Sequence, residues 1–182
     1  FFCTAALLMA ATVCVTGCKD DSEDDLKNVG PSDVSVFINE VCSSGTDWVE
    51  LYNPSDEEAS LAGFRLQDNK GTDEEYIFPD GAAIAAHGYL VLENGADFEF
   101  GISGDGDEVK LLDASYRLVD DIIVPALEDG QTYARISDGN ESWDVVDGGT
   151  KGKDNTSAPD EGEEPGKSAV NLVINEVMSA PL

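Results

Sequence analysis

A strand, a short turn and a second strand in residues 38–54 place the strongest constraint on the fold. Ile38-Asn39-Glu40-Val41 is followed by Asp47-Trp48-Val49-Glu50-Leu51-Tyr52-Asn53-Pro54. Proline cannot donate to a strand ladder, so Asn-Pro is expected to end the second strand. The same opening recurs as Ile174-Asn175-Glu176-Val177. This recurrence predicts copies of one small β module, the second of which begins near the last residue given.

Short apolar runs separated by Gly, Asn, Asp and Pro continue after this motif. They predict strands at Val34–Val41, Trp48–Asn53, Phe64–Gln67, Tyr76–Phe78, Tyr89–Leu92, Val109–Leu112, Leu118–Val124, Tyr133–Ile136 and Trp143–Val146. Strands at this spacing are typical of an antiparallel sandwich or barrel. No helix is predicted after residue 17, because the one candidate, 61–66, is short and contains Gly63.

Alternation within the second strand predicts which side chains face the core. Val49 and Leu51 share one face and are expected inside, whereas Trp48, Glu50 and Tyr52 share the other. We expect Trp48 to wrap an edge or to close one end of the sandwich.

Residues 1–17 have the pattern of a signal segment. Phe1–Val15 is almost wholly apolar and, at about 15 residues, is shorter than the roughly 20 that span a bilayer. We expect a signal-peptide core truncated at its N-terminus, since an initiating Met and a basic leader are absent; a buried core helix is the alternative.

Val15-Thr16-Gly17-Cys18 resembles the lipobox of bacterial lipoproteins. The resemblance implies cleavage between Gly17 and Cys18 and a diacylglycerol thioether on Cys18, with the membrane as a partner. Several acyl chains would anchor the protein stably. The expected location is the outer membrane, exposed at the cell surface or else facing the periplasm.

Residues 18–33 are expected to form an acidic tether. The run at 19–25 is expected to act as a charged spacer that holds the domain away from the membrane. It also resembles an acidic signal for export to the cell surface, and both interpretations can be true. Of the four cysteines, only Cys42 remains unmodified in the mature chain, so no internal disulfide is available. Cys42 is predicted to be a small buried apolar residue.

Two further segments follow the central domain. Residues 156–169 are rich in Pro, Gly, Glu and Asp and predict a disordered linker. Apolar sequence resumes at 170–182, which is interpreted as the truncated start of a second module.

The charge balance excludes some partners. The net charge is −28 with only 10 Lys and Arg, which argues against nucleic acid and against charge-driven docking on anionic lipid. The hydrophobic fraction of 41% is ordinary and allows a packed core.

Residues 34–155 resemble the lamin-tail domain family in sequence order. After the opening motif, the matching pieces are Leu61-Ala62-Gly63-Phe64-Arg65-Leu66 with Asp68, Ile77-Phe78-Pro79 with Gly81, Gly88-Tyr89-Leu90-Val91-Leu92, Gly106-Asp107-Glu108-Val109-Lys110-Leu111 with Asp113, and Ala134-Arg135-Ile136 with Asp138-Gly139. The closing element, Thr150-Lys151-Gly152-Lys153-Asp154-Asn155, departs from the family's Thr-Pro-Gly-like turn and Asn. The resemblance implies an immunoglobulin-like antiparallel β-sandwich that is non-catalytic, and in bacteria it implies a place in tandem arrays or beside surface hydrolases.

The residues that could carry chemistry do not assemble into a reaction centre. His87 is the only histidine and is predicted to sit in a turn facing water. Glu40 and Glu50 are expected to lie across a hairpin with a polar structural role. The sequence lacks a Gly-x-Ser-x-Gly elbow and a complete Gly-x-x-x-x-Gly-Lys-Ser/Thr loop, and it predicts no cofactor.

Three acidic residues are the best metal candidates. Asp105, Asp107 and Glu108 lie on a turn of the kind that supplies oxygen ligands to calcium, but the full calcium-loop pattern is missing, so an acidic hairpin turn is the favoured interpretation.

The sequence therefore predicts a lipid-anchored surface protein whose sandwich binds, adheres or acts as a spacer. Its ligand is expected to be a surface protein or a polysaccharide. The rival hypothesis is an accessory domain that positions an enzyme beyond residue 182; calcium-dependent adhesion is a third.

Overall fold

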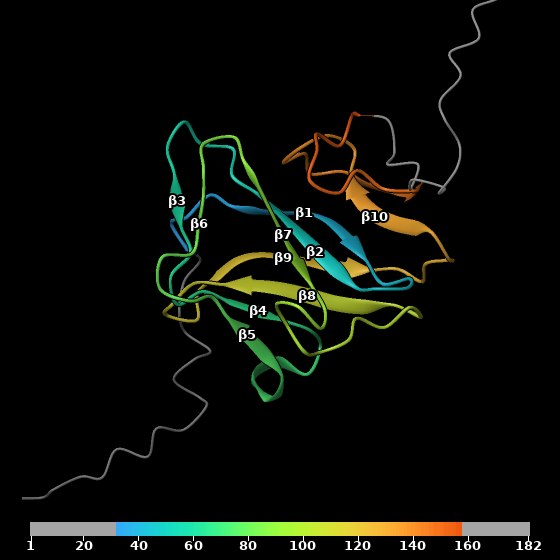
Figure 1. Ribbon diagram of the computed structural model, residues 1–182, viewed down its shortest axis with the longest axis horizontal. Helices are drawn as coiled ribbons and strands as arrows, with labels where there is room; N and C mark the ends of the chain where they lie inside the picture. Colours follow the sequence, from blue (N-terminus) through green and yellow to red (C-terminus); the bar gives the residue numbers. More distant parts are fainter. Residues whose placement is uncertain (1–31, 158–182) are drawn as a thin grey trace, which may run out of the picture.

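The computed structural model describes residues 32–157, which form two packed antiparallel sheets (Figure 1). The five-stranded sheet has the order β11-β10-β1-β2-β7, and the four-stranded sheet has the order β5-β4-β8-β9. A two-stranded ribbon, β3-β6, lies at one end. The predicted antiparallel sandwich is confirmed.

The strands are short, as the spacing of the apolar runs predicts. Their bounds are β1 Phe37–Cys42, β2 Trp48–Tyr52, β3 Ala59–Ser60, β4 Arg65–Gln67, β5 Glu75–Ile77, β6 Ala83–Ile84, β7 Tyr89–Glu93, β8 Asp107–Leu112, β9 Leu118–Val124, β10 Gln131–Arg135 and β11 Trp143–Asp147. All nine predicted strands are present, with ends shifted by up to three residues.

Two short strands are additional to the prediction. β3 and β6 are not predicted, because a two-residue strand is too short to give an apolar run in the sequence. The described residues contain no α-helix, as predicted, and a single turn of 3-10 helix, η2 (Gly71–Asp73), precedes β5.

A bulge in β1 explains how the opening motif serves two faces. Ile38 pairs with Leu51 and Glu40 pairs with Glu50, so Asn39 is an extra residue opposite the β2 ladder. Ile38 and Val41 therefore both reach the core, with 0% exposure, while Glu40 points to the outer face.

The core lies between the two sheets, and Val49 and Leu51 are both fully buried in it, as predicted. Trp48 is also buried, at 7% exposure, on the opposite side of β2. The fully or nearly buried core side chains include Ile38, Val41, Val49, Leu51, Leu61, Leu66, Phe78, Ile84, Phe98, Phe100, Val109, Leu111 and Val124. Burying each such side chain contributes about 1.5–3 kcal/mol.

Several predicted segments lie outside the described residues: the signal segment, Gly17 and Cys18, the tether up to residue 31, and the chain from residue 158 onward. Within 32–157, no helix has the length and apolar character needed to cross a membrane.

Candidate functional site

The outer face of the five-stranded sheet holds a buried pair of carboxyl groups. Glu40 and Glu50 lie opposite each other on β1 and β2, and both have 0% exposure. The segment 148–157, called here the closing segment, supplies Thr150 and Gly152 as hydrogen-bond donors to this pair.

Glu40 is surrounded by donors from distant parts of the chain. Its carboxylate accepts a hydrogen bond from the Thr132 hydroxyl at 2.5 Å. It also accepts from the Thr150 hydroxyl at 2.7 Å and from the Thr150 amide at 3.0 Å. A buried carboxyl group with this many donors holds β10 and the closing segment to β1.

The surroundings of Glu50 disfavour the charged form of its carboxyl group. It accepts from the Asn39 side-chain amide at 2.9 Å and from the Gly152 amide at 2.6 Å. Burial raises the pKa of Glu50 to about 7; its hydrogen bonds oppose the shift, whereas the charges of Glu40 and Asp138 add to it.

An amide and a carboxylate continue this network. The Asn155 side chain donates to the carbonyls of Asn39 at 3.1 Å and Arg135 at 2.8 Å. Asp138 accepts from the Asn39 side chain, from the Asn155 amide and from the Tyr89 hydroxyl. The network encloses the carboxyl pair, which is thereby committed to holding strands together rather than facing a substrate.

The predicted metal candidates do not converge. The Asp107 carboxylate accepts from the amides of Ser103 and Glu108, and the Glu108 carboxylate pairs with Lys110 at 2.5 Å. Asp105 is exposed. Among residues 32–157, no group of three or more His, Cys, Asp or Glu side chains is placed to hold a metal ion.

His87 and Cys42 lie where the sequence predicts them. His87 sits in an exposed turn with a φ of 54°, and its Nε2 is 2.9 Å from Asp56. Cys42 is buried at 7% exposure, and its thiol donates to the Ser44 carbonyl. Within residues 32–157, the contacts of His87 and Cys42 do not bring a nucleophile and a general base together.

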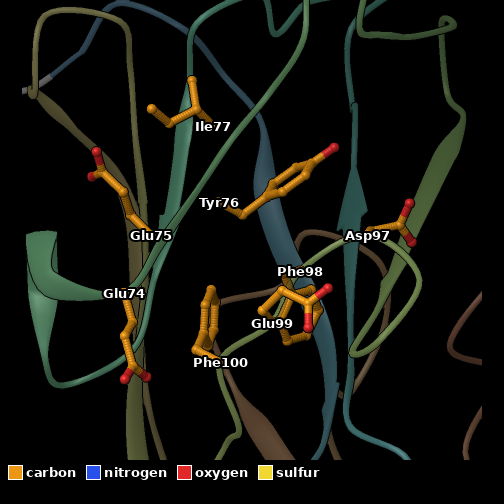
Figure 2. Close-up of a pocket in the computed structure, with 8 residues that line it drawn as sticks. All are labelled: Glu74, Glu75, Tyr76, Ile77, Asp97, Phe98, Glu99 and Phe100. Atoms are coloured by element: carbon orange, nitrogen blue, oxygen red, sulfur yellow. The ribbon is translucent and has the colours of Figure 1, made fainter.

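A pocket of about 370 Å³ lies between β5 and the loop that follows β7 (Figure 2). Its lining is acidic and aromatic, and comprises Glu74, Glu75, Tyr76, Ile77, Asp97, Phe98, Glu99 and Phe100. Figure 2 shows the Tyr76 ring directed toward the loop, while the side chains of Glu75 and Ile77 lie on the other side of β5.

Buried aromatic side chains lie beneath this pocket. Phe98 and Phe100 are 1% and 3% exposed, and their ring centroids are 4.5 Å apart. Tyr76 packs against Phe78 edge to face. These rings belong to the core and hold the loop 97–100 in place.

The four carboxylates that line this pocket differ in how far they are paired. Glu75 accepts from the Gln67 side chain at 2.8 Å and lies 3.5 Å from the Arg65 guanidinium. Glu74 pairs with Lys70 at 2.6 Å, and Asp97 accepts one bond, from the Glu93 amide. Glu99 is exposed and makes no hydrogen bond or ion pair within the described part of the chain. Burial, and then the charge of Asp97, raise the pKa of Tyr76.

Sequence reasoning missed this pocket. Its two walls are separated by about twenty residues and meet only through the sandwich. The signal that could have shown it is the alternation Asp97-Phe98-Glu99-Phe100, which places acids and aromatics on opposite sides of an extended segment.

The Lamin Tail Domain family model matches residues 30–126, more than half of the chain. The chain belongs to the lamin tail domain family. The family is immunoglobulin-like, in agreement with the all-β architecture of the described residues. Its members are in general non-catalytic. No curated protein matches the chain.

The matched region of this lamin tail domain contains β1 to β9 and both walls of the pocket. β10, β11 and the closing segment come after it and complete the five-stranded sheet. Thr150, Gly152 and Asn155 of the closing segment donate hydrogen bonds to Glu40, to Glu50 and to the Asn39 carbonyl.

Proposed function

We propose that this lamin tail domain is the non-catalytic binding module of a lipid-anchored protein presented at a cell surface. In this proposal Cys18 carries the lipid, residues 18–33 form the tether, and the sandwich is the presented unit. The observation that carries the binding role is the contrast between an enclosed carboxyl pair and an open pocket with an unpaired carboxylate.

The geometry supports binding over catalysis. The buried carboxyl pair of Glu40 and Glu50 is occupied by donors from the same chain, so it offers no access to a substrate. The pocket contains carboxylates and aromatic rings but no histidine, cysteine or serine in its lining. Such a lining suits recognition of a ligand rather than bond cleavage.

The lipid anchor is tested by metabolic labelling with palmitate in the organism that makes the protein. We expect label on the wild-type chain and none on a Cys18→Ala variant. Cys14→Ala is the matched control, because it removes a cysteine four residues away and should leave the label in place. Label that persists in Cys18→Ala would contradict the anchor.

Surface presentation is tested separately by adding protease to intact cells. We expect the sandwich to be removed from intact cells as readily as from lysed cells. Protection until lysis would instead indicate a periplasm-facing protein. The rival role, positioning an enzyme encoded after residue 182, would be favoured by a hydrolase sequence following the motif at 174–177.

A further inference from the structure

The edge of the four-stranded sheet offers a place for another strand. β5 pairs with β4, and within the described residues no strand pairs with its other edge. The amide of Phe78 donates to the Phe64 carbonyl at 2.9 Å, so Phe78 is directed toward β4. Because bonding directions alternate along an antiparallel strand, the N–H and C=O of Ile77 point away from β4. The Ile77 side chain is 52% exposed.

The acidic and aromatic pocket adjoins this edge. Glu74 to Ile77 form one wall, and Asp97 to Phe100 form the other. A lysine or arginine side chain suits such a lining, because its alkyl stem can pack on the half-buried Tyr76 ring while its charged end reaches carboxylates. Asp97 and Glu99 supply negative charge there, and the pocket lining contains no basic residue to cancel it.

The segments that flank the domain in residues 1–182 are acidic, as the domain is. Residues 1–31 contain two lysines and five acidic residues, and residues 158–182 contain one lysine and five acidic residues. A second copy would bring another net charge of −28. Charge complementarity therefore points to a different molecule that carries positive charge.

We infer that the open edge of β5 binds an extended, basic polypeptide segment that adds to the sheet as a strand and places a lysine or arginine side chain between Tyr76 and Glu99. Strand addition supplies affinity through main-chain hydrogen bonds, and the pocket supplies selectivity for a basic side chain. This inference rests on the proposed binding function and narrows its ligand to a basic polypeptide.

The test is a calorimetric titration of the chain with a short peptide that alternates lysine and threonine. We expect binding that weakens as salt is added, and no binding of the matched glutamate and threonine peptide. Glu99→Lys should weaken binding at least about fivefold, because it reverses a charge in the pocket. Glu58→Lys is the matched control, since Glu58 is an exposed acid in the loop before β3 and its reversal should leave the affinity nearly unchanged.

Strand addition is tested with a second pair of variants. Ile77→Pro removes the outward N–H, whereas Ile77→Ala removes only the side chain. We expect the proline variant to lose peptide binding and the alanine variant to keep it, with circular dichroism showing that both remain folded. If Ile77→Pro unfolds the chain, deuterium exchange of the wild-type β5 amides replaces it, and slowed exchange on adding peptide is the expected result.

Three results would overturn the inference. The first is absence of binding by the lysine peptide. The second is equal weakening by Glu99→Lys and Glu58→Lys, which would indicate general charge attraction. The third is spermine binding as tightly as the peptide with the same response to the variants, which would indicate a small-cation site. None of these depends on lipidation, so a negative palmitate experiment and a negative titration overturn different proposals.

Discussion

Two acidic regions of this sandwich behave in opposite ways. On the covered face, meaning the outer face of the five-stranded sheet beneath residues 148–157, Glu40 and Glu50 are fully buried and bonded to donors of the same chain. In the open pocket beside β5, Glu99 is exposed and has no partner among residues 32–157. The two regions show that the position of a carboxylate, more than its presence, decides whether it builds the fold or meets a ligand.

The physical reason lies in desolvation. A buried carboxylate costs several kcal/mol unless donors replace water, so a fold that keeps one must surround it. The closing segment does this for Glu40, with Thr150 providing both its amide and its hydroxyl. An exposed carboxylate keeps its water and needs no such partner, which leaves it free to pair with another molecule.

The largest expected difference between the two regions is in the cost of deleting a carboxylate. Glu40→Ala should lower the free energy of unfolding by about 3 kcal/mol, because it leaves buried donors on Thr132 and Thr150 without an acceptor. Glu99→Ala should change it by less than about 0.5 kcal/mol. Urea unfolding of both variants measures this, and equal costs would remove the distinction.

The pH dependence of stability should report Glu50. The pKa of Glu50 is about 7 in the folded chain, against an ordinary value of 4.5, so between these pH values the folded chain holds a proton that the unfolded chain has lost. The contribution of Glu50 to the free energy of unfolding is therefore fully present below about pH 4.5 and is lost as the pH rises through about 7.

Glu50→Gln should therefore reduce the loss of unfolding free energy between about pH 5 and about pH 8 by roughly 2 kcal/mol relative to wild type. Urea midpoints at the two pH values give this difference. Glu99→Gln is the control and should leave the wild-type slope unchanged. A wild-type slope in Glu50→Gln would show that this group does not titrate in the way proposed.

Two glycines of the closing segment separate packing from backbone strain. Gly149 and Gly152 both have positive φ, at 67° and 75°. A Cβ on Gly149 would lie 2.7 Å from Glu40 Oε1 and 2.8 Å from Thr132 Cγ2, whereas one on Gly152 would meet nothing within 4 Å. Gly149→Ala should cost about 2 kcal/mol and Gly152→Ala about 1 kcal/mol, since the second carries only the backbone term. Thermal unfolding at fixed pH ranks them, and the reverse order would show that the closing segment does not sit against Glu40.

The smallest expected effect concerns calcium. Both Asp107 oxygens accept backbone amides and Glu108 pairs with Lys110, so the turn at 105–108 offers no ready cage. Millimolar calcium and magnesium should raise the melting temperature equally, through screening of the net negative charge. A larger increase in melting temperature with calcium than with magnesium would support the hypothesis of calcium-dependent adhesion.

Local patterns predict this molecule well where neighbours in sequence decide the structure. Val49 and Leu51 alternate with polar residues, so their burial follows from the strand period. The same period places Glu50 on the other face but cannot show that the face is covered, because Gly152 is 102 residues away. The pocket is missed for the same reason, since its walls are β5 and the loop after β7, which meet only in the folded chain.

Hydrogen–deuterium exchange with and without the lysine and threonine peptide tests the central distinction most directly. The account predicts that peptide slows exchange at residues 74–77 and 97–100 and leaves residues 148–157 unchanged, because the carboxylates there are already occupied. Slowed exchange across 148–157 without any change at 74–77 would contradict it.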